Sequence, residues 1–228
     1  MSRYIAPLMI GVLGTAILVG LGVWQMQRLA WKEALLAEIE ARMELDPVAL
    51  PADPDPVADR FRPVVLDGRY GEGLALVTVP AEGGGGVRLR VIRPLELEDG
   101  RRVLLELGKV SPEVIDSFQT LPVYRGSGIL YWPDEVDVFT PERDKGGNVW
   151  YARDIPAMAA ELGTEPLLVI ARAGEKGNPL LVPSEPDPAR IPNNHLQYAV
   201  TWFGLAAVWA GMTVYWLLRL RRRRYLER

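Results

Sequence analysis

The sequence predicts a membrane α+β protein. Two transmembrane helices at the termini are expected to flank a mostly antiparallel β extracytoplasmic domain with one or two short helices. Two uncharged apolar runs, residues 5–25 and 199–218, are each long enough to cross a hydrocarbon core of about 30 Å as a helix. Between them, segments rich in β-branched and apolar residues alternate with turn residues, which favours a β-sheet or an open barrel.

The first apolar run is predicted to be a retained transmembrane helix, residues 1–28. A signal peptide has an apolar region of only about 7–15 residues before a small-residue cleavage site. This run is longer and ends in Trp24 and Gln25. Helical periodicity continues beyond it, and we expect the helix to stop before Asp46, where prolines and acidic residues begin to alternate. Residues 29–58 are therefore expected to form a helical extension and a Pro-rich linker.

Residues 59–192 are predicted to form the extracytoplasmic β-rich domain. Apolar residues and arginines alternate in residues 87–91, as in a half-buried strand, and Asp99-Gly100 predicts a tight hairpin. Strands are expected at residues 61–70, 74–79, 87–97, 101–110, 123–131 and 167–172.

One short helix is expected in this domain at residues 155–162. Asp154 can cap its free backbone N–H groups, and Pro156 suits its first turn. Gly163 suits the position at which a helix ends. The pattern therefore predicts both ends of the helix.

The charges divide the chain into two parts. Residues 29–196 carry 18 Lys and Arg against 28 Asp and Glu, whereas the remaining residues carry 8 Arg against one Glu. The arginines that follow Leu218 indicate a C-terminal transmembrane helix, residues 193–219, and a basic cytoplasmic tail, residues 220–228. Both termini are then cytoplasmic. With no Arg- and Ser-rich transit segment, we expect a multi-pass protein of the bacterial inner (plasma) membrane with a periplasmic domain; the mitochondrial inner membrane is the alternative.

The composition argues against several classes of function. The chain has no cysteine, which excludes disulfides, thiolate metal sites and cysteine nucleophiles. An acidic domain without a basic face gives no reason to expect nucleic acid as a partner. The acidic residues Asp134, Glu135 and Asp137 lack the spacing of a calcium loop and indicate a solvated surface. One histidine and serines without a nucleophile-elbow context give no catalytic arrangement, so we do not expect an enzyme.

His195, the only histidine, lies just before the second apolar run. The pair Asn193-Asn194 indicates a helix start with a side-chain cap, which places His195 in the first turn of the membrane helix. The positive end of the helix dipole disfavours an imidazolium there, and a neutral imidazole has a lone pair for a metal. The alternative is an interfacial polar residue that is hydrogen-bonded to a neighbour or to a lipid headgroup.

Antiparallel spans would place the end of the first helix beside the beginning of the second. Trp24, Arg28 and Trp31 then share one helix face at about the depth of His195. Taken singly, they are typical interface anchors. Together with His195 they offer the axial nitrogen, the cation and the flat apolar walls that a haem requires. Small residues could let the helices approach closely: Gly11, Gly14, Ala16, Gly20, Gly204, Ala207 and Gly211.

Three stretches resemble the signatures of the Surfeit-locus/Shy family of cytochrome c oxidase assembly factors. They are residues 22–32, which include Trp24-Gln25, residues 148–156, which include Trp150-Tyr151, and residues 193–203 around His195. Two terminal spans around one domain match this family as well. The resemblance implies an assembly factor for haem-copper cytochrome c oxidase that binds haem a between its two membrane helices and aids its insertion into oxidase subunit I.

The resemblance also implies site residues and partners. His195 would be the metal ligand, and the partners would be cytochrome c oxidase subunit I, the lipid bilayer and, as a further candidate, the haem a synthase. A second axial ligand could come from another copy or from the synthase, or be absent. The cofactor-binding positions that carry over to this chain are His195, Arg28, Trp24, Gln25, Tyr198 and Trp202.

Two stretches depart from the pattern expected of the family. Glu106-Leu107-Gly108-Lys109 stands where an Asn-Arg-Gly-Trp-like strand end is usual, and Arg143-Asp144 stands where Asn-Asp is expected. These departures affect any contact that the predicted extracytoplasmic domain makes with the oxidase. The alternative function is a membrane adaptor that scaffolds oxidase subunits during assembly and does not bind haem. The two functions differ on whether His195 coordinates iron.

Overall fold

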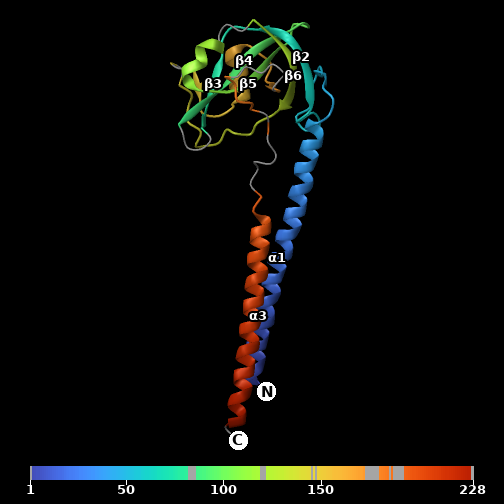
Figure 1. Cartoon of the computed structure of the whole chain (residues 1–228), viewed down its shortest axis with the longest axis vertical. Helices are drawn as coiled ribbons and strands as arrows, with labels where there is room; N and C mark the ends of the chain where they lie inside the picture. The colour runs from blue at the N-terminus through green and yellow to red at the C-terminus, as the bar shows by residue number, and fades with distance from the viewer. Residues whose placement is uncertain are drawn as a thin grey trace. The chain divides into compact units, whose positions relative to one another are not determined.

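The computed structural model describes residues 2–81, 86–118, 122–144, 146, 148–172, 180–184, 186 and 193–226. The chain divides into two compact units, residues 1–38 with 188–228 and residues 39–187, and both can be followed in Figure 1. The predicted domain boundary at residue 192 and the last two residues of the predicted tail lie outside the described residues.

The first unit is built from two long helices, α1 (Ser2–Met43) and α3 (His195–Leu226). Each contains a stretch that is long and apolar enough to cross a membrane, with a mean hydropathy of 2.2 in α1 and 1.4 in α3. Only 17% and 6% of these stretches are buried inside the protein, so most of their apolar side chains face outward, as lipid-facing side chains do. The predicted membrane α+β class is confirmed, and α1 ends before Asp46, as expected.

The two helices lie antiparallel and touch at glycines. A Cβ atom added to Gly11 would lie 2.1 Å from Thr213 Cγ2, and one added to Gly22 would lie 2.6 Å from Phe203 Cε1. A Cβ atom at Gly14 would lie 2.4 Å from the Trp209 indole nitrogen. A larger residue at any of these positions would force the neighbouring helix or its side chains to move, which is how small residues permit close packing in membranes.

The other small residues predicted at this contact do not contribute to it. A Cβ atom at Gly20, Gly204 or Gly211 would meet nothing within 4 Å. Ala16 and Ala207 are exposed. On α3, the small residues that are buried are Ala199 and Ala206 instead of the predicted ones. Helical periodicity explains the correction, because only residues spaced three or four apart share one face of a helix.

The second unit is a β-barrel with two flanking helical segments. Six of its strands confirm the six predicted segments, and two strands of two residues each were too short to give a pattern. The strands are β1 (Val48–Ala49), β2 (Pro63–Tyr70), β3 (Ala75–Pro80), β4 (Val87–Leu97), β5 (Arg102–Val110), β6 (Val123–Tyr131), β7 (Val149–Trp150) and β8 (Leu168–Ala171).

The strand pairing closes the barrel. Strands β2, β6, β8, β5 and β4 are neighbours in this order, and the end of β4 pairs back to β2. The β5–β8, β1–β2 and β3–β7 pairs are parallel, and the other pairs are antiparallel. The predicted hairpin joins β4 to β5, where Gly100 takes a φ of +84° that a residue with a side chain rarely adopts. A 3-10 helix, η2 (Pro112–Phe118), follows β5.

Alternate residues of β5 face two separate cores. Val103, Leu105 and Leu107 belong to the core that also contains Phe118, whereas Leu104 packs on the other side of the strand beneath α2 (Ile155–Leu162). This alternation is the period of two that a β-strand imposes on its side chains. It leaves Glu106, which shares a side with Leu104, with no exposure to solvent.

The helix α2 begins and ends as the sequence predicts. The Asp154 carboxylate accepts a hydrogen bond from the Ala157 N–H at 3.1 Å, and Pro156 lies in the first turn. Gly163 ends the helix with a left-handed conformation, and its N–H donates to the Ala159 carbonyl.

Packing at the glycine contacts can be tested with Gly11→Ala and Gly20→Ala. Both changes should improve helix propensity equally, but only Gly11→Ala places a methyl group against the Thr213 side chain. We expect Gly11→Ala to weaken helix–helix association by about 1–3 kcal/mol, as overpacking does. Disulfide trapping between cysteines introduced into α1 and α3 measures this association. Equal trapping in the two variants would contradict the close contact.

Candidate functional site

His195 meets a buried amide on the other helix. Its Nδ1 lies 2.8 Å from Gln25 Oε1, a contact between residues 170 positions apart in the chain. Gln25 is only 8% exposed, and His195 is half-buried. Of the six predicted site residues, these two are joined directly by a hydrogen bond.

His195 is the first residue of α3, as predicted from the preceding asparagines. The Asn194 carbonyl accepts the Tyr198 N–H at 3.1 Å, which is the first hydrogen bond of the helix. The expected side-chain cap is not made by Asn193, because its buried Oδ1 has no hydrogen-bond partner. Asn194 therefore starts the helix through its backbone.

The contact with Gln25 occupies one ring nitrogen of His195, Nδ1. An amide oxygen only accepts hydrogen bonds, so an Nδ1–H group would be the donor in this contact. The other ring nitrogen, Nε2, takes no part in it. A histidine that ligates a metal commonly uses its other nitrogen in this way.

The remaining predicted site residues lie outside the buried contact. Trp24 and Tyr198 are about half exposed, and Trp202 is half-buried. The Arg28 guanidinium lies 4.6 Å from the centre of the Trp31 ring, and the Arg28 side chain is exposed. Arg28 and Trp31 thus share one face, as the i, i+3 spacing requires.

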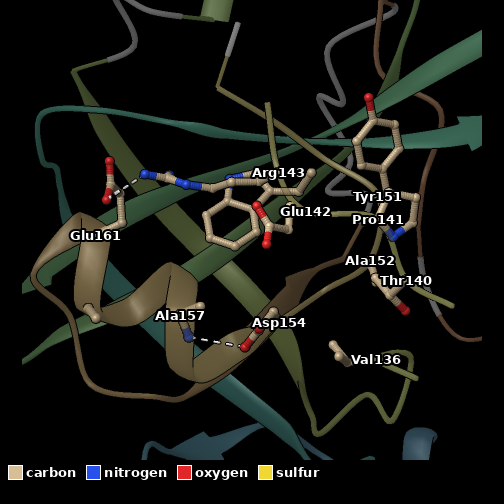
Figure 2. Close-up of a pocket in the computed structure, with 12 residues that line it drawn as sticks. Val136, Thr140, Pro141, Glu142, Arg143, Tyr151, Ala152, Asp154, Ala157 and Glu161 are labelled. Carbon is tan, nitrogen blue, oxygen red and sulfur yellow. Dashed lines mark hydrogen bonds and ion pairs between the residues drawn. The ribbon is translucent and has the colours of Figure 1, made fainter. Parts of the chain in front are cut away.

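A second candidate site lies in the β-barrel unit, beside the stretch 148–156. A cavity of about 720 Å³ lies between α2 and the segment that precedes β7. Figure 2 shows the residues that line it. Arg143 crosses it, with its guanidinium 2.9 Å from Glu161 and 4.8 Å from the centre of the Trp150 ring. None of the described residues that line the cavity is a serine, cysteine or histidine.

A buried ionic network holds this stretch against the sheet. Glu106 Oε2 lies 3.1 Å from Arg153 Nη1, and Glu106 Oε1 lies 3.7 Å from Arg90 Nε. On the other side, Glu135 accepts hydrogen bonds from the Arg153 guanidinium and from its backbone N–H. Two carboxylates and two guanidiniums compensate each other, which is what buried charges require.

The charges in this network shift the pKa values of its members. Burial opposes charge on Arg153, but hydrogen bonding to Glu135 and the charges of Glu106 and Glu135 outweigh it and raise the pKa of Arg153. Burial also favours the neutral form of Glu135, yet the hydrogen bond and charge of Arg153 hold the pKa of Glu135 below its usual value. Glu135 is exposed, as the predicted solvated surface requires, and its carboxylate is also paired with Arg153, which is 18 positions away in the sequence.

The two departures from the family pattern have local explanations. Glu106 belongs to the ionic network, and Arg143 stacks on Trp150. Gly108 has a φ of +145°, and a Cβ atom there would lie 2.8 Å from the Val182 carbonyl oxygen. The retained glycine is therefore needed for the close approach of backbone, next to the irregular pairing between β4 and β5.

Among the described residues, no group of three or more His, Asp or Glu side chains could hold a metal ion. The fold and this site define a class: a membrane protein with two terminal spans around one β-barrel domain and a single histidine at the contact between the spans.

Comparison with known proteins shows the family to which the chain belongs. The model of the SURF1 family matches residues 12–207, and the chain belongs to this family. Surfeit locus protein 1 of Rattus norvegicus is 32% identical over 211 residues, which cover 82% of this chain and 68% of the relative. The human protein of the same name is 32% identical over 82% of this chain and 70% of its own length. A SURF1-like protein of Monosiga brevicollis is 29% identical over 86% of this chain and 82% of its own. The family is associated with cytochrome c oxidase assembly.

The ionic network can be tested with Glu106→Gln in residues 39–187 expressed alone. The amide leaves Arg153 and Arg90 with one carboxylate between them, so we expect the free energy of unfolding to fall by about 3–5 kcal/mol. Urea denaturation followed by circular dichroism measures the loss. The matched control is Glu96→Gln on the exposed side of β4, which should change stability by less than about 0.5 kcal/mol. Equal small effects would show that the network contributes little.

Proposed function

We propose that this protein is an assembly factor for haem-copper cytochrome c oxidase. In this proposal it binds haem a at the His195 end of the two membrane helices and aids insertion of the haem into oxidase subunit I. Membership of the family supports the link to oxidase assembly. The observation that supports haem binding is the His195–Gln25 hydrogen bond, because it engages Nδ1 and leaves Nε2 as the ring nitrogen for a ligand.

The residues near His195 fit a haem as cargo. The imidazole would supply an axial nitrogen to the iron, and the macrocycle of the haem itself supplies the equatorial nitrogens. Arg28 would pair with a propionate, since its exposed guanidinium is held only against Trp31. Trp24, Tyr198 and Trp202 present aromatic surface that a flat macrocycle would cover. The partners in this proposal are the lipid bilayer, oxidase subunit I and the haem a synthase as donor.

The proposed location is the bacterial inner membrane, with both termini in the cytoplasm and the β-barrel in the periplasm. The support is the arginine cluster that follows Leu218, together with the acidic balance of residues 29–196.

A second candidate function is a membrane adaptor that scaffolds oxidase subunits and carries no haem. One observation favours it: the Gln25–His195 hydrogen bond joins the two helices without any ligand. Polar pairs of this kind also join helices in membranes for purely structural reasons. Whether the purified wild-type protein carries haem separates the two candidates.

The topology can be tested with reporter fusions that are active only in the periplasm. A fusion after residue 228 should be silent, because the arginines resist translocation. A fusion inserted at the β4–β5 hairpin, at Gly100, should be active. The reverse pattern would contradict the proposed orientation.

The role of His195 can be tested by substitution in cells that make haem a. We expect His195→Ala to abolish haem in the purified protein, because it removes the only imidazole. Arg28→Ala should lower the affinity less, by roughly tenfold to a hundredfold, because a charge-assisted hydrogen bond contributes only about 1.5–3 kcal/mol. Haem-to-protein ratios from absorption spectra measure both effects.

The control for these variants is the amount of protein in the membrane, which should stay at the wild-type level. His195→Ala protein at that level with undiminished haem would end the ligand assignment. A wild-type protein without haem that still copurifies with oxidase subunits would favour the adaptor.

A further inference from the structure

Gln25 lies buried between the helices, although its position in the first signature suggested a contact with the cofactor. We infer that Gln25 is a positioning residue: it fixes His195 in the tautomer with the proton on Nδ1, so that Nε2 is the nitrogen that faces iron. The role in haem binding rests on the proposed function, whereas the tautomer does not. Gln25 therefore acts on the haem through His195.

The first support is the geometry of the contact. Gln25 Oε1 and His195 Nδ1 are 2.8 Å apart, which is a normal hydrogen-bond length. Gln25 is 8% exposed, so little of its amide is left for a cargo to touch. Trp24 and Arg28, the other first-signature residues assigned to the site, are both exposed. Gln25 thus differs from them in the direction it faces.

The second support is the rigidity of the surroundings. One turn before Gln25, Gly22 lies so close to Phe203 that no Cβ atom would fit between them. Ala199, one turn after His195, is only 1% exposed. The two helices are thus in contact immediately beside the hydrogen bond, which keeps the backbones that carry Gln25 and His195 close together.

The third support is chemical. If the amide were turned over, its NH₂ group would donate to Nδ1, and the proton of the neutral ring would move to Nε2. A protonated Nε2 cannot ligate iron. The two orientations therefore predict opposite tautomers and opposite binding abilities. With Oε1 as the acceptor, donation from Nδ1–H also makes the ring a stronger electron donor at Nε2.

The single histidine allows the tautomer to be read directly. Full-length protein labelled with ¹⁵N-histidine, purified in lipid nanodiscs through a tag without histidine, should give one set of imidazole signals. At mildly alkaline pH, long-range ¹H–¹⁵N spectra should show the proton on Nδ1. In Gln25→Leu the proton should move largely to Nε2, the tautomer that free histidine prefers. Wild-type protein with the proton on Nε2 would overturn the inference, whatever the protein does with haem.

The chain supplies a matched control two positions along the same helix. Gln27 is exposed, so Gln27→Leu removes the same amide from the same helix without touching His195. Its imidazole signals should equal those of the wild type. Gln25→Glu keeps an acceptor for Nδ1–H and should retain the wild-type tautomer. The same variant keeps the inference testable if Gln25→Leu fails to accumulate in the membrane.

Haem binding supplies the second readout. Gln25→Leu should bind haem about 10–100-fold more weakly than Gln27→Leu, which is the usual effect of losing the partner of a metal-ligating histidine. Gln25→Glu should keep its haem but shift the midpoint potential to more negative values, because a carboxylate increases electron donation from the ring. Resonance Raman spectra should show a stronger iron–histidine bond in this variant.

The outcomes separate the two claims. If His195→Ala loses haem but Gln25→Leu matches Gln27→Leu in affinity and potential, the proposed function stands and the positioning role fails. If His195→Ala keeps haem, the proposed ligand fails, and the role of Gln25 toward iron fails with it. The tautomer measurement remains decisive for the hydrogen bond in either case.

Discussion

In the low-dielectric interior of a membrane, each buried polar group needs a partner within the protein, and the contact between α1 and α3 depends on this constraint. A buried amide such as that of Gln25 needs a hydrogen-bonding group on the neighbouring helix, and His195 provides it. The hydrogen bond therefore aligns the two helices in depth and rotation at one end. The contacts at Gly11, Gly14 and Gly22 maintain this alignment over the rest of the pair, because side chains of α3 occupy the space above each glycine.

In the β-barrel unit, buried charged groups likewise have partners within the protein. Glu106 is placed in the interior by the alternation of β5, and a lone buried carboxylate would be costly. Arg153 and Arg90 compensate it, and Glu135 in turn compensates the arginines. The consequence is that residues 150–154 are tied to the sheet through Arg153 as well as through the β3–β7 pairing. The cavity beside Trp150 therefore has one rigid wall, formed by this segment and α2.

Local signals allowed most of the fold to be predicted from the sequence. The ends of α2 depend on Asp154, Pro156 and Gly163, which are part of the helix or directly flank it, and the hairpin depends on Asp99-Gly100. The long-range pairs could not be predicted in this way. Glu106 and Arg153 are 47 positions apart, and charged residues are ordinarily found at the surface. The length of the apolar run was enough to place His195 in the first turn of α3. Its hydrogen-bond partner Gln25 could not be predicted, because the residues of α1 that face α3 depend on which glycines make contact.

The same packing limits where a cargo can reach His195. Between Gly11 and Gly22 the helices are too close to admit even an added methyl group at the three contact glycines, so a macrocycle has no room in that part of the seam. Beyond Gly22, the side chains of Gln25 and His195 face each other, and Trp24 and Tyr198 are exposed at this end. A flat ligand of Nε2 would therefore bind at the His195 end of the pair, against aromatic side chains that otherwise face lipid or water. If the proposed function holds, release of the haem to another membrane protein would then require no separation of the helices.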